Sequence, residues 1–247
     1  MDTRAELQAE VRIGTSGWHY KHWIGSFYPP GTPASKMLAY YVERFDTVEL
    51  NNSFYHLPKQ PALESWRNST PDGFCFAAKG SRFLTHMKKL KDPEQGLKRF
   101  FGAIDLLGEK LGPILFQLPP NWELDLERLK IFVECLPTEH RYAFEFRNAT
   151  WSVPVAYDLL KRHNIAYCIF DLAGVQSPVE VTADIAYVRL HGPGGRYQGS
   201  YSDEALNGWA KRIRKWQREL KAIYVYFDND QAGYAAENAL RLKSMLD

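Results

Sequence analysis

The sequence predicts an α/β fold, a single (β/α)8 TIM barrel, and three observations support this prediction. The chain has 247 residues, close to the length of about 250 that is typical of this barrel. Short β-rich runs alternate with longer amphipathic segments along the chain, which predicts parallel strands joined by right-handed crossovers. Eight such runs occur, the number that closes a barrel. A doubly wound open sheet is the alternative.

The expected strands are short runs rich in β-branched and aromatic residues. They cover Val11–Ser16, Thr47–Asn51, Phe74–Lys79, Ile114–Leu118, Tyr142–Arg147, Ile165–Asp171, Ile185–His191 and Ile223–Asn229.

Amphipathic segments fill the intervals between these strands. In Pro33–Phe45, for example, Met37, Leu38 and Tyr41 recur at helical spacing. Several segments begin with Pro in the first turn or with a Ser or Asp cap, as helices do. Ala173–Asp184 is too short and too interrupted by proline for a full helix. The other expected helices are Pro61–Asn68, Pro93–Leu111, Leu124–Leu136, Val153–His163, Ser202–Leu220 and Ala232–Leu246.

Composition excludes several classes of protein. The net charge of +2 is too small to indicate nucleic acid or an anionic membrane by itself. Cys75, Cys135 and Cys168 lie far apart without a CxxC pair, which argues against a disulfide framework and a cysteine-type zinc site. Neither a cofactor nor a tightly bound metal is therefore expected. The polar start lacks the apolar core of a signal peptide, and no segment has the roughly 20 apolar residues of a membrane helix, so we expect a cytoplasmic protein without a membrane partner.

The expected domain organisation is simple. Residues 1–10 form a polar tail and residues 11–247 form one barrel domain, since no linker or repeat interrupts the alternation.

Polar residues enter the expected strands mainly at their C-terminal ends. Strands buried on both faces should be almost wholly apolar. In Thr47–Asn51, however, Val48 and Leu50 alternate with Glu49 and Asn51. The same alternation places further polar side chains inside the barrel mouth, where barrel enzymes have their active sites. The inward set is Glu49, Asn51, Glu145, Arg147, Arg189 and His191, with Lys79, Gln117 and Asn229 at the ends of other strands.

The loops above this face add binding groups. His86 follows the third strand, and a glycine-rich loop with Tyr197 follows the seventh, where barrels often bind phosphate. Trp18 follows the first strand, where it either stacks on a ligand or caps the core.

Six motifs together resemble one family. They are Gly14–Trp18, Val48–Tyr55, Phe116–Pro120, Phe144–Arg147, Val188–Gly192 and Tyr226–Asp230. In their order and spacing, from about Ile13 to the C-terminus, the chain resembles the YecE-like family, the domain of unknown function 72. The resemblance implies a (β/α)8 barrel, similar in fold to the group of endonuclease IV and xylose isomerase, but no established activity. The sequence departs from the His-rich metal clusters of that group, and from the family's own pattern in having Asp228 where asparagine is usual.

The leading functional hypothesis is an enzyme that acts on an anionic, phosphorylated sugar or a nucleotide-like substrate. Glu49 or Glu145 would be its general acid or base, with His191 as the proton-transfer partner. Lys79, Arg147 and Arg189 would neutralise charge on the substrate and the transition state. The remaining expected binding residues are Trp18, Asn51, His86, Gln117, Tyr197 and Asn229.

Three alternatives remain open at this point. Basic clusters at Lys88–Lys91 and Lys211–Arg218 allow a nucleic-acid-binding or endonuclease IV-like barrel, although such clusters are usually solvated helix faces. Glu49 and Glu145 could form the carboxylate pair of an inverting glycosidase. Finally, the acids could simply neutralise the arginines in a closed structural network.

Overall fold

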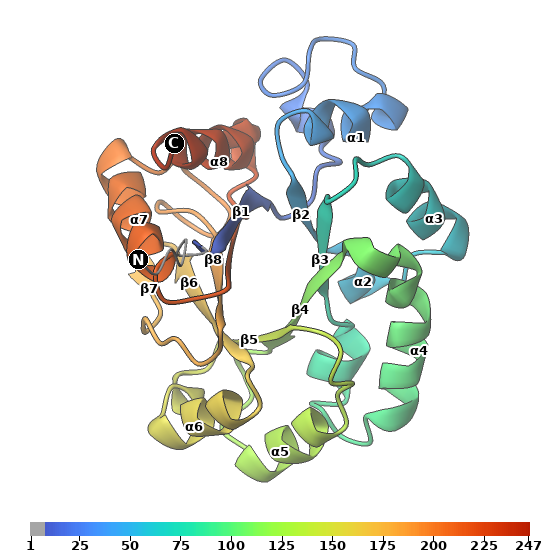
Figure 1. Ribbon diagram of the computed structural model, residues 1–247, viewed down its shortest axis with the longest axis vertical. Coiled ribbons are helices and arrows are strands. Elements are labelled where there is room, and N and C mark those ends of the chain that lie inside the picture. Colours follow the sequence, from blue (N-terminus) through green and yellow to red (C-terminus); the bar gives the residue numbers. More distant parts are fainter. Residues whose placement is uncertain (1–7) are drawn as a thin grey trace, which may run out of the picture.

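The computed structural model describes residues 8–247 and confirms the expected fold class. Eight parallel strands form a nearly closed ring with the helices on its outside (Figure 1). A ninth strand, β7, is a two-residue antiparallel addition to β6. Around the ring the order is β1, β9, β8, β6, β5, β4, β3, β2. The strands are β1 (Glu10–Thr15), β2 (Thr47–Leu50), β3 (Cys75–Lys79), β4 (Leu111–Leu118), β5 (Tyr142–Phe146), β6 (Ala166–Leu172), β7 (Val175–Gln176), β8 (Ile185–Leu190) and β9 (Ala222–Phe227).

The ring closes between β1 and β2 through little direct pairing. Ser16 and Glu49 form a single parallel bridge there, and the Gly17 amide donates to the Glu49 carbonyl at 2.9 Å. Tyr41, on helix α1 (Ala34–Val42), spans the same gap. Its hydroxyl accepts from the Thr15 amide and donates to the Thr47 carbonyl, each at 3.0 Å. A side chain thus supplies part of the bonding that a strand ladder supplies elsewhere.

Helices cover the strands from outside, and most of them return the chain to the start of the next strand (Figure 1). Two have side-chain caps: Ser202 accepts from the Ala205 amide before α7, and Asp125 accepts from the Arg128 amide before α5. The α-helices are α1 (Ala34–Val42), α2 (Asn52–Tyr55), α3 (Gln60–Asn68), α4 (Glu94–Ile104), α5 (Leu126–Glu134), α6 (Pro154–Arg162), α7 (Asp203–Trp216) and α8 (Tyr234–Ser244). Short helical turns lie at Lys21–Trp23, Phe83–Met87, Asp105–Lys110, Ala149–Trp151 and Gln231–Gly233.

One expected helix is shorter in the structure. The segment Pro93–Leu111 contains α4, which ends at Ile104, followed by a tight turn. Gly108 breaks the helical path with φ 57° and ψ −131°, a combination that glycine tolerates. The fourth strand consequently starts at Leu111 rather than Ile114. The chain between β6 and β8 forms the β7 hairpin instead of a helix, as its proline content indicates.

The expected N-terminal tail lies mostly outside the described residues, and Glu10 already belongs to β1. Among the residues that the structure describes, none of the helices combines the length and the apolar character needed to cross a membrane.

Strand alternation divides the core into two parts. Between the strands and the helices lies a large aliphatic and aromatic layer that includes Phe116, Phe144 and Val188. Inside the barrel lies a smaller cluster of alanine, cysteine and tyrosine with few large aliphatic residues. Its members include Ala77, Leu115, Ala143, Ala166, Cys168, Tyr187, Tyr224 and Tyr226. Small side chains here leave space for the long polar side chains of the next layer toward the C-terminal ends of the strands.

Replacing Gly14 by alanine tests the β1–β2 closure. A Cβ at this position in β1 would lie 2.3 Å from the Thr47 carbonyl oxygen, so backbone must move. We expect Gly14→Ala to lower the free energy of unfolding by roughly 1–3 kcal/mol, as overpacking does. Gly102→Ala is the matched control, because in the last turn of α4 its Cβ meets nothing within 4 Å. That variant should gain about 0.5–1 kcal/mol. Urea denaturation that ranks the two variants equally would contradict this view of the closure.

Candidate functional site

Arg189, on β8, lies at the centre of the barrel mouth and is wholly buried. Its Nε donates to Glu49 Oε2 at 3.0 Å, and its Nη1 donates to Glu145 Oε2 at 2.9 Å. Its Nη2 donates to Glu49 Oε1 at 2.7 Å and to Asp228 Oδ2 at 3.0 Å. Three carboxylates from β2, β5 and the end of β9 thus converge on one guanidinium. We call these four residues, with Arg147 and His191, the Arg189 cluster.

Glu49 has no free carboxylate oxygen for a ligand. Besides Arg189, the hydroxyl of Ser16 donates to Oε1 and the hydroxyl of Tyr187 donates to Oε2, the latter at 2.7 Å. The whole residue is buried. Because both oxygens accept bonds within the fold, the expected role of Glu49 as a general base would require the cluster to rearrange.

Glu145 is held in a similar way. Arg147 Nε donates to its Oε1, and Arg189 occupies its Oε2. Burial alone would raise the pKa of Glu145, but the two guanidinium groups hold that pKa well below its usual range. The group is therefore a fixed anion near neutral pH, which suits electrostatic stabilisation better than proton transfer.

His191 is neutral in this environment, and its tautomer follows from its neighbours. Its Nε2 lies 2.9 Å from Arg147 Nη2 and 3.3 Å from Arg189 Nη1. Guanidinium groups only donate, so Nε2 must accept and the ring proton must be on Nδ1. That atom lies 3.0 Å from Asp228 Oδ2. Burial, together with the charge of Arg189, lowers the pKa of His191. Its expected role in proton transfer stays a prediction, since both nitrogens face protein groups.

The centre of the mouth is already filled by a cation. The Arg189 guanidinium occupies the space between Glu49, Glu145 and Asp228 where a metal ion would otherwise find its ligands. These carboxylates therefore do not present an open ligand set.

Lys79, at the end of β3, differs from the arginines because its charge is not matched by a direct partner. Its Nζ lies 4.6 Å from the centre of the Phe54 ring, and within residues 8–247 it forms neither a hydrogen bond nor an ion pair. Only 9 % of the residue is exposed. Burial and, next, the charge of Arg189 lower the pKa of Lys79 to about 8. A share of neutral amine is therefore present in the barrel mouth near physiological pH.

His86 lies beside Lys79. Its ring packs edge-on against the Phe54 ring at 5.0 Å, and its Nδ1 lies 2.9 Å from the Thr85 hydroxyl. Burial and, next, the charge of Lys79 lower the pKa of His86 to about 4. The imidazole is consequently neutral at pH 7.

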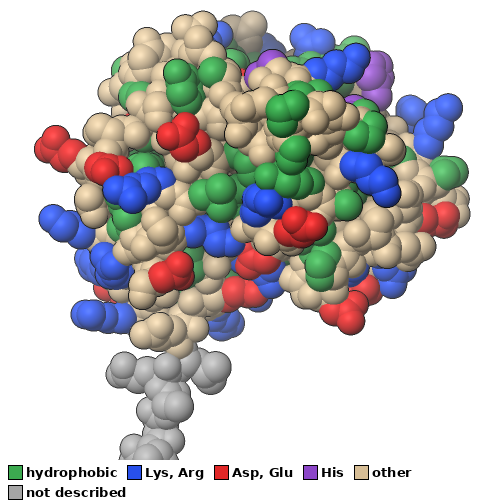
Figure 2. Space-filling view, turned by 90° about the horizontal axis from the view of Figure 1, so that it is seen from above, with side chains coloured by type: hydrophobic (Ala, Val, Ile, Leu, Met, Phe, Trp, Pro, Cys, Tyr) green, Lys and Arg blue, Asp and Glu red, His purple; other side chains and the backbone are tan. Residues whose placement is uncertain are grey.

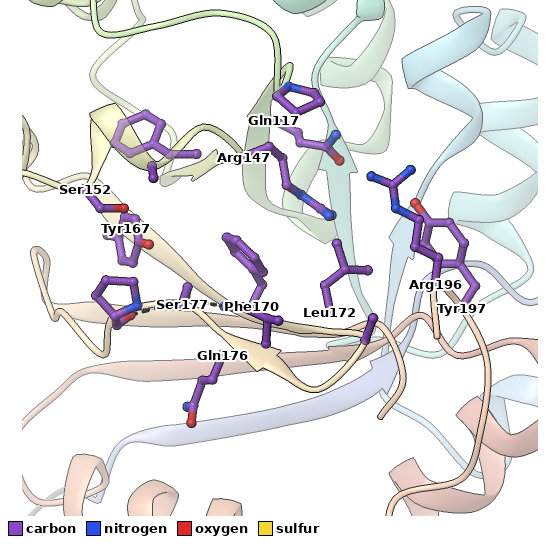
Figure 3. A pocket seen from close by; sticks show the side chains of 16 residues that line it. Gln117, Arg147, Ser152, Tyr167, Phe170, Leu172, Gln176, Ser177, Arg196 and Tyr197 are labelled. Atoms are coloured by element: carbon purple, nitrogen blue, oxygen red, sulfur yellow. Dashed lines mark hydrogen bonds between the residues drawn. The ribbon is translucent and has the colours of Figure 1, made fainter. Parts of the chain in front are cut away.

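A cavity of about 520 Å³ opens beside the Arg189 cluster at the C-terminal ends of β4, β5 and β6 (Figure 3). Gln117 and Arg147 extend into it from neighbouring strands, and Phe170 forms part of its wall. Arg196 and Tyr197 come from the loop after β8. Arg147 uses Nε for Glu145 and Nη2 for His191, whereas its Nη1 forms no hydrogen bond within the described part of the chain. That nitrogen leaves two donors for a ligand.

Three expected binding residues lie elsewhere. Trp18 is 8 % exposed and packs edge-on against Trp66 at 5.2 Å, so it caps the core. Asn51 lines a separate hollow with Trp18. Asn229 is wholly buried and donates to the Gly199 carbonyl and to Asn238 Oδ1. In the structure Asn229 therefore holds the loop after β8 in place.

Sequence reasoning overlooked Tyr187, Phe170 and Ser16. Tyr187 lies two residues before Arg189, and Phe170 two residues after the inward-facing Cys168, so strand alternation alone could have identified both. Ser16 gave no such signal, because its contact with Glu49 depends on how the ring closes.

Replacing Arg189 by alanine tests whether the cluster is a structural network. The change would leave Glu49, Glu145 and Asp228 facing one another without their shared partner. We expect Arg189→Ala to cost roughly 3–5 kcal/mol in the free energy of unfolding, as breaking a buried ion pair does. Arg218→Ala, an exposed arginine on the outside of the barrel, is the control and should change little. A stable Arg189→Ala protein would contradict the structural role.

Replacing Lys79 by methionine tests the unmatched amine. We expect Lys79→Met to stabilise the fold at pH 7 by roughly 1–3 kcal/mol, since it removes an unpaired buried charge. Between pH of about 8 and 10.5 the unfolded chain binds more protons at this position than the fold does. Wild-type stability therefore rises through this window, and the advantage of the variant shrinks. The measurement is urea denaturation at several pH values.

Lys110 is the matched control for this prediction. It is also buried, but its Nζ donates to the carbonyls of Arg67 and Thr70 at 2.7 and 2.6 Å. Lys110→Met should therefore destabilise the fold, because it leaves buried carbonyls without a donor. A Lys79→Met variant that is destabilised as Lys110→Met is would show that Lys79 is not an unpaired charge.

Comparison with known proteins agrees with this fold. The family model described as "Protein of unknown function DUF72" matches residues 12–247. UPF0759 protein YunF of Bacillus subtilis (strain 168) is 28 % identical over 273 aligned positions, covering 96 % of this chain and 95 % of YunF. UPF0759 protein YecE of Escherichia coli (strain K12) is 27 % identical over 139 positions, covering 56 % of this chain and 48 % of YecE.

One solved structure leads to the same family, and a second shares the fold. A DUF72 family protein of Thermotoga maritima, TM1631, superimposes with a TM-score of 0.88 and 32 % identity, covering 96 % of this chain and 99 % of that one. The DUF72 family protein EF0366 of Enterococcus faecalis superimposes with a TM-score of 0.80 at 21 % identity, covering 97 % and 98 % of the two chains. With the barrel, the strand-end motifs and the match over residues 12–247, the chain belongs to the DUF72 family.

Proposed function

We propose that this protein is an enzyme that binds an anionic sugar-like or nucleotide-like substrate in the cavity beside Arg147. The observation that carries the proposal is the position of Arg147 Nη1. The other two nitrogens of this guanidinium fix it to Glu145 and His191, while Nη1 remains available at the wall of the cavity. A pre-oriented donor pair of this kind suits phosphate or carboxylate oxygens.

The remaining cavity wall supports the same class of ligand. Arg196 adds a second positive charge, and Gln117 adds an amide that can orient hydroxyl groups. Phe170 lies 5.0 Å from the Arg147 guanidinium carbon and presents an apolar face, as Tyr197 does from the other loop. Cavities of 300–1,000 Å³ with few polar groups among apolar walls are typical of small-molecule sites.

Two perturbed bases favour an enzyme over a simple binding protein. Lys79 and His86 lie at the mouth with lowered pKa values and without an ion-pair partner within residues 8–247. Maintaining an unpaired amine costs free energy, so a functional use is the better explanation. The glycosidase alternative receives less support, because Arg189 holds Glu49 and Glu145 together as ion pairs. Acidic and basic side chains are interspersed on the face drawn in Figure 2, which gives no support to a nucleic-acid groove there.

Phosphate-dependent melting tests the proposal. Millimolar phosphate or ribose 5-phosphate should raise the melting temperature of the wild-type protein, by mass action. Arg147→Ala should weaken the apparent affinity by about tenfold or more, equivalent to about 1.4 kcal/mol. Arg196→Ala should weaken it by roughly threefold to tenfold while leaving the fold unchanged, because Arg196 is exposed and has no partner in the described residues.

Arg218→Ala removes the same charge from an exposed position on the outside of the barrel and serves as the control. It should respond to phosphate as the wild type does. A wild-type melting temperature that ignores both ligands, or an equal loss of response in Arg218→Ala, would overturn the proposed binding site.

A further inference from the structure

The protein has two buried lysines in opposite chemical states. Lys110 donates to the Arg67 carbonyl, the Thr70 carbonyl and the Thr70 hydroxyl at 2.7, 2.6 and 3.2 Å. Those three acceptors use all the protons of its ammonium group. Lys79, in contrast, forms neither a hydrogen bond nor an ion pair within residues 8–247, although three carboxylates lie in the same barrel mouth.

The carboxylates do not pair with Lys79 because they are already committed. Glu49, Glu145 and Asp228 face the lysine from β2, β5 and the end of β9, and all three accept hydrogen bonds from Arg189. Arg189 itself faces Lys79 as a like charge. A lysine desolvated beside another cation is the arrangement that activates an amine for nucleophilic attack.

Phe54 and His86 complete the surroundings of the amine. The Phe54 ring contacts both, with Lys79 Nζ at 4.6 Å and the His86 ring at 5.0 Å from its centre. His86 stays neutral at pH 7 and binds the Thr85 hydroxyl through Nδ1. Its Nε2 makes no hydrogen bond within residues 8–247, so that nitrogen can accept a hydrogen bond from a substrate hydroxyl group.

We propose that Lys79 is a nucleophilic amine that forms an imine with an aldehyde or ketone group of the substrate. This inference rests on the proposed function and names its substrate class: a carbonyl compound that carries a phosphate or carboxylate, such as an open-chain sugar phosphate. With its anionic end at Arg147 and Arg196, the substrate would extend past Gln117 of β4 to the end of the neighbouring strand β3, where Lys79 lies.

The step balances without any oxidant, reductant or metal. The lone pair on Lys79 Nζ attacks the carbonyl carbon, and the carbonyl oxygen takes up a proton to give a carbinolamine. The nitrogen loses a proton to water. The hydroxyl group then leaves with a further proton as water, and a C=N bond forms. Hydrolysis by water reverses the sequence.

Borohydride trapping tests the imine directly. The full-length protein is incubated with dihydroxyacetone phosphate or, separately, with pyruvate, then reduced with sodium borohydride and analysed by intact mass and peptide mapping. We expect one reduced adduct per chain, at Lys79, that is absent from Lys79→Met. The saturated Lys110 should remain unmodified in the same sample and serves as an internal control. Adducts spread over exposed lysines, with none enriched at Lys79, would overturn the proposal.

Competitive acetylation of the wild-type protein provides a second readout that needs no substrate and no variant. The rate of acetylation at Lys79 should rise with a midpoint near pH 8, well below the ordinary lysine value of 10.5. An ordinary midpoint at Lys79 would contradict an activated amine.

Different results would contradict the anion site and the imine at Lys79. If phosphate still stabilises the fold through Arg147 but neither carbonyl probe is trapped at Lys79, the imine is wrong and the anion site stands. If Lys79 is trapped equally in wild type and Arg147→Ala, and phosphate has no effect on melting, the anion site is wrong and the reactive amine stands.

Discussion

One guanidinium organises the C-terminal mouth of this barrel. Arg189 joins carboxylates from β2, β5 and the end of β9, which lie far apart in the sequence and on different parts of the ring. An unpaired carboxylate at this depth would cost several kcal/mol, so each acid depends on the same partner. The sparse pairing between β1 and β2 lies next to this cluster. Ser16 and Glu49 form the bridge that closes the ring, Glu49 belongs to the cluster, and the Ser16 hydroxyl bonds to Glu49 and Arg189. Closure of the barrel and charge pairing at its mouth are therefore linked.

The charged side chains of the mouth fall into two groups: those whose donors are fully bonded within the protein, and those with donors left for a ligand. All three nitrogens of the Arg189 guanidinium donate hydrogen bonds to protein groups. In Arg147, Nε and Nη2 are bonded in this way, whereas Nη1 forms no hydrogen bond with the described residues. Lys79 has no direct partner at all in that range, and burial beside Arg189 lowers its pKa. The Arg189 layer thus fixes the position of Arg147, which lines the cavity. Such preorganisation by a supporting layer is what a precise binding site requires.

Much of the fold and part of the site could be predicted from the sequence. Strand alternation correctly placed Glu49, Glu145 and Arg189 on the inner face, because side chains in a strand alternate strictly between faces. Alternation says nothing about which inward residues meet, since that depends on ring order and strand stagger. Trp18 and Asn229 lie at strand ends as expected, yet local packing turned one toward the core and the other toward a loop. The helix predicted from the sequence over Pro93–Leu111 is too long, because the prediction took no account of the break in the helical path at Gly108.

The most direct test of this division of roles is a crystal structure of the protein grown or soaked with ribose 5-phosphate. The expected result is a phosphate group bound by Arg147 Nη1 and Arg196, with Arg189 still bonded to Glu49, Glu145 and Asp228 as it is without ligand. A phosphate that displaces a carboxylate from Arg189 would contradict the structural role of the cluster. A ligand found only outside the cavity would contradict the site itself.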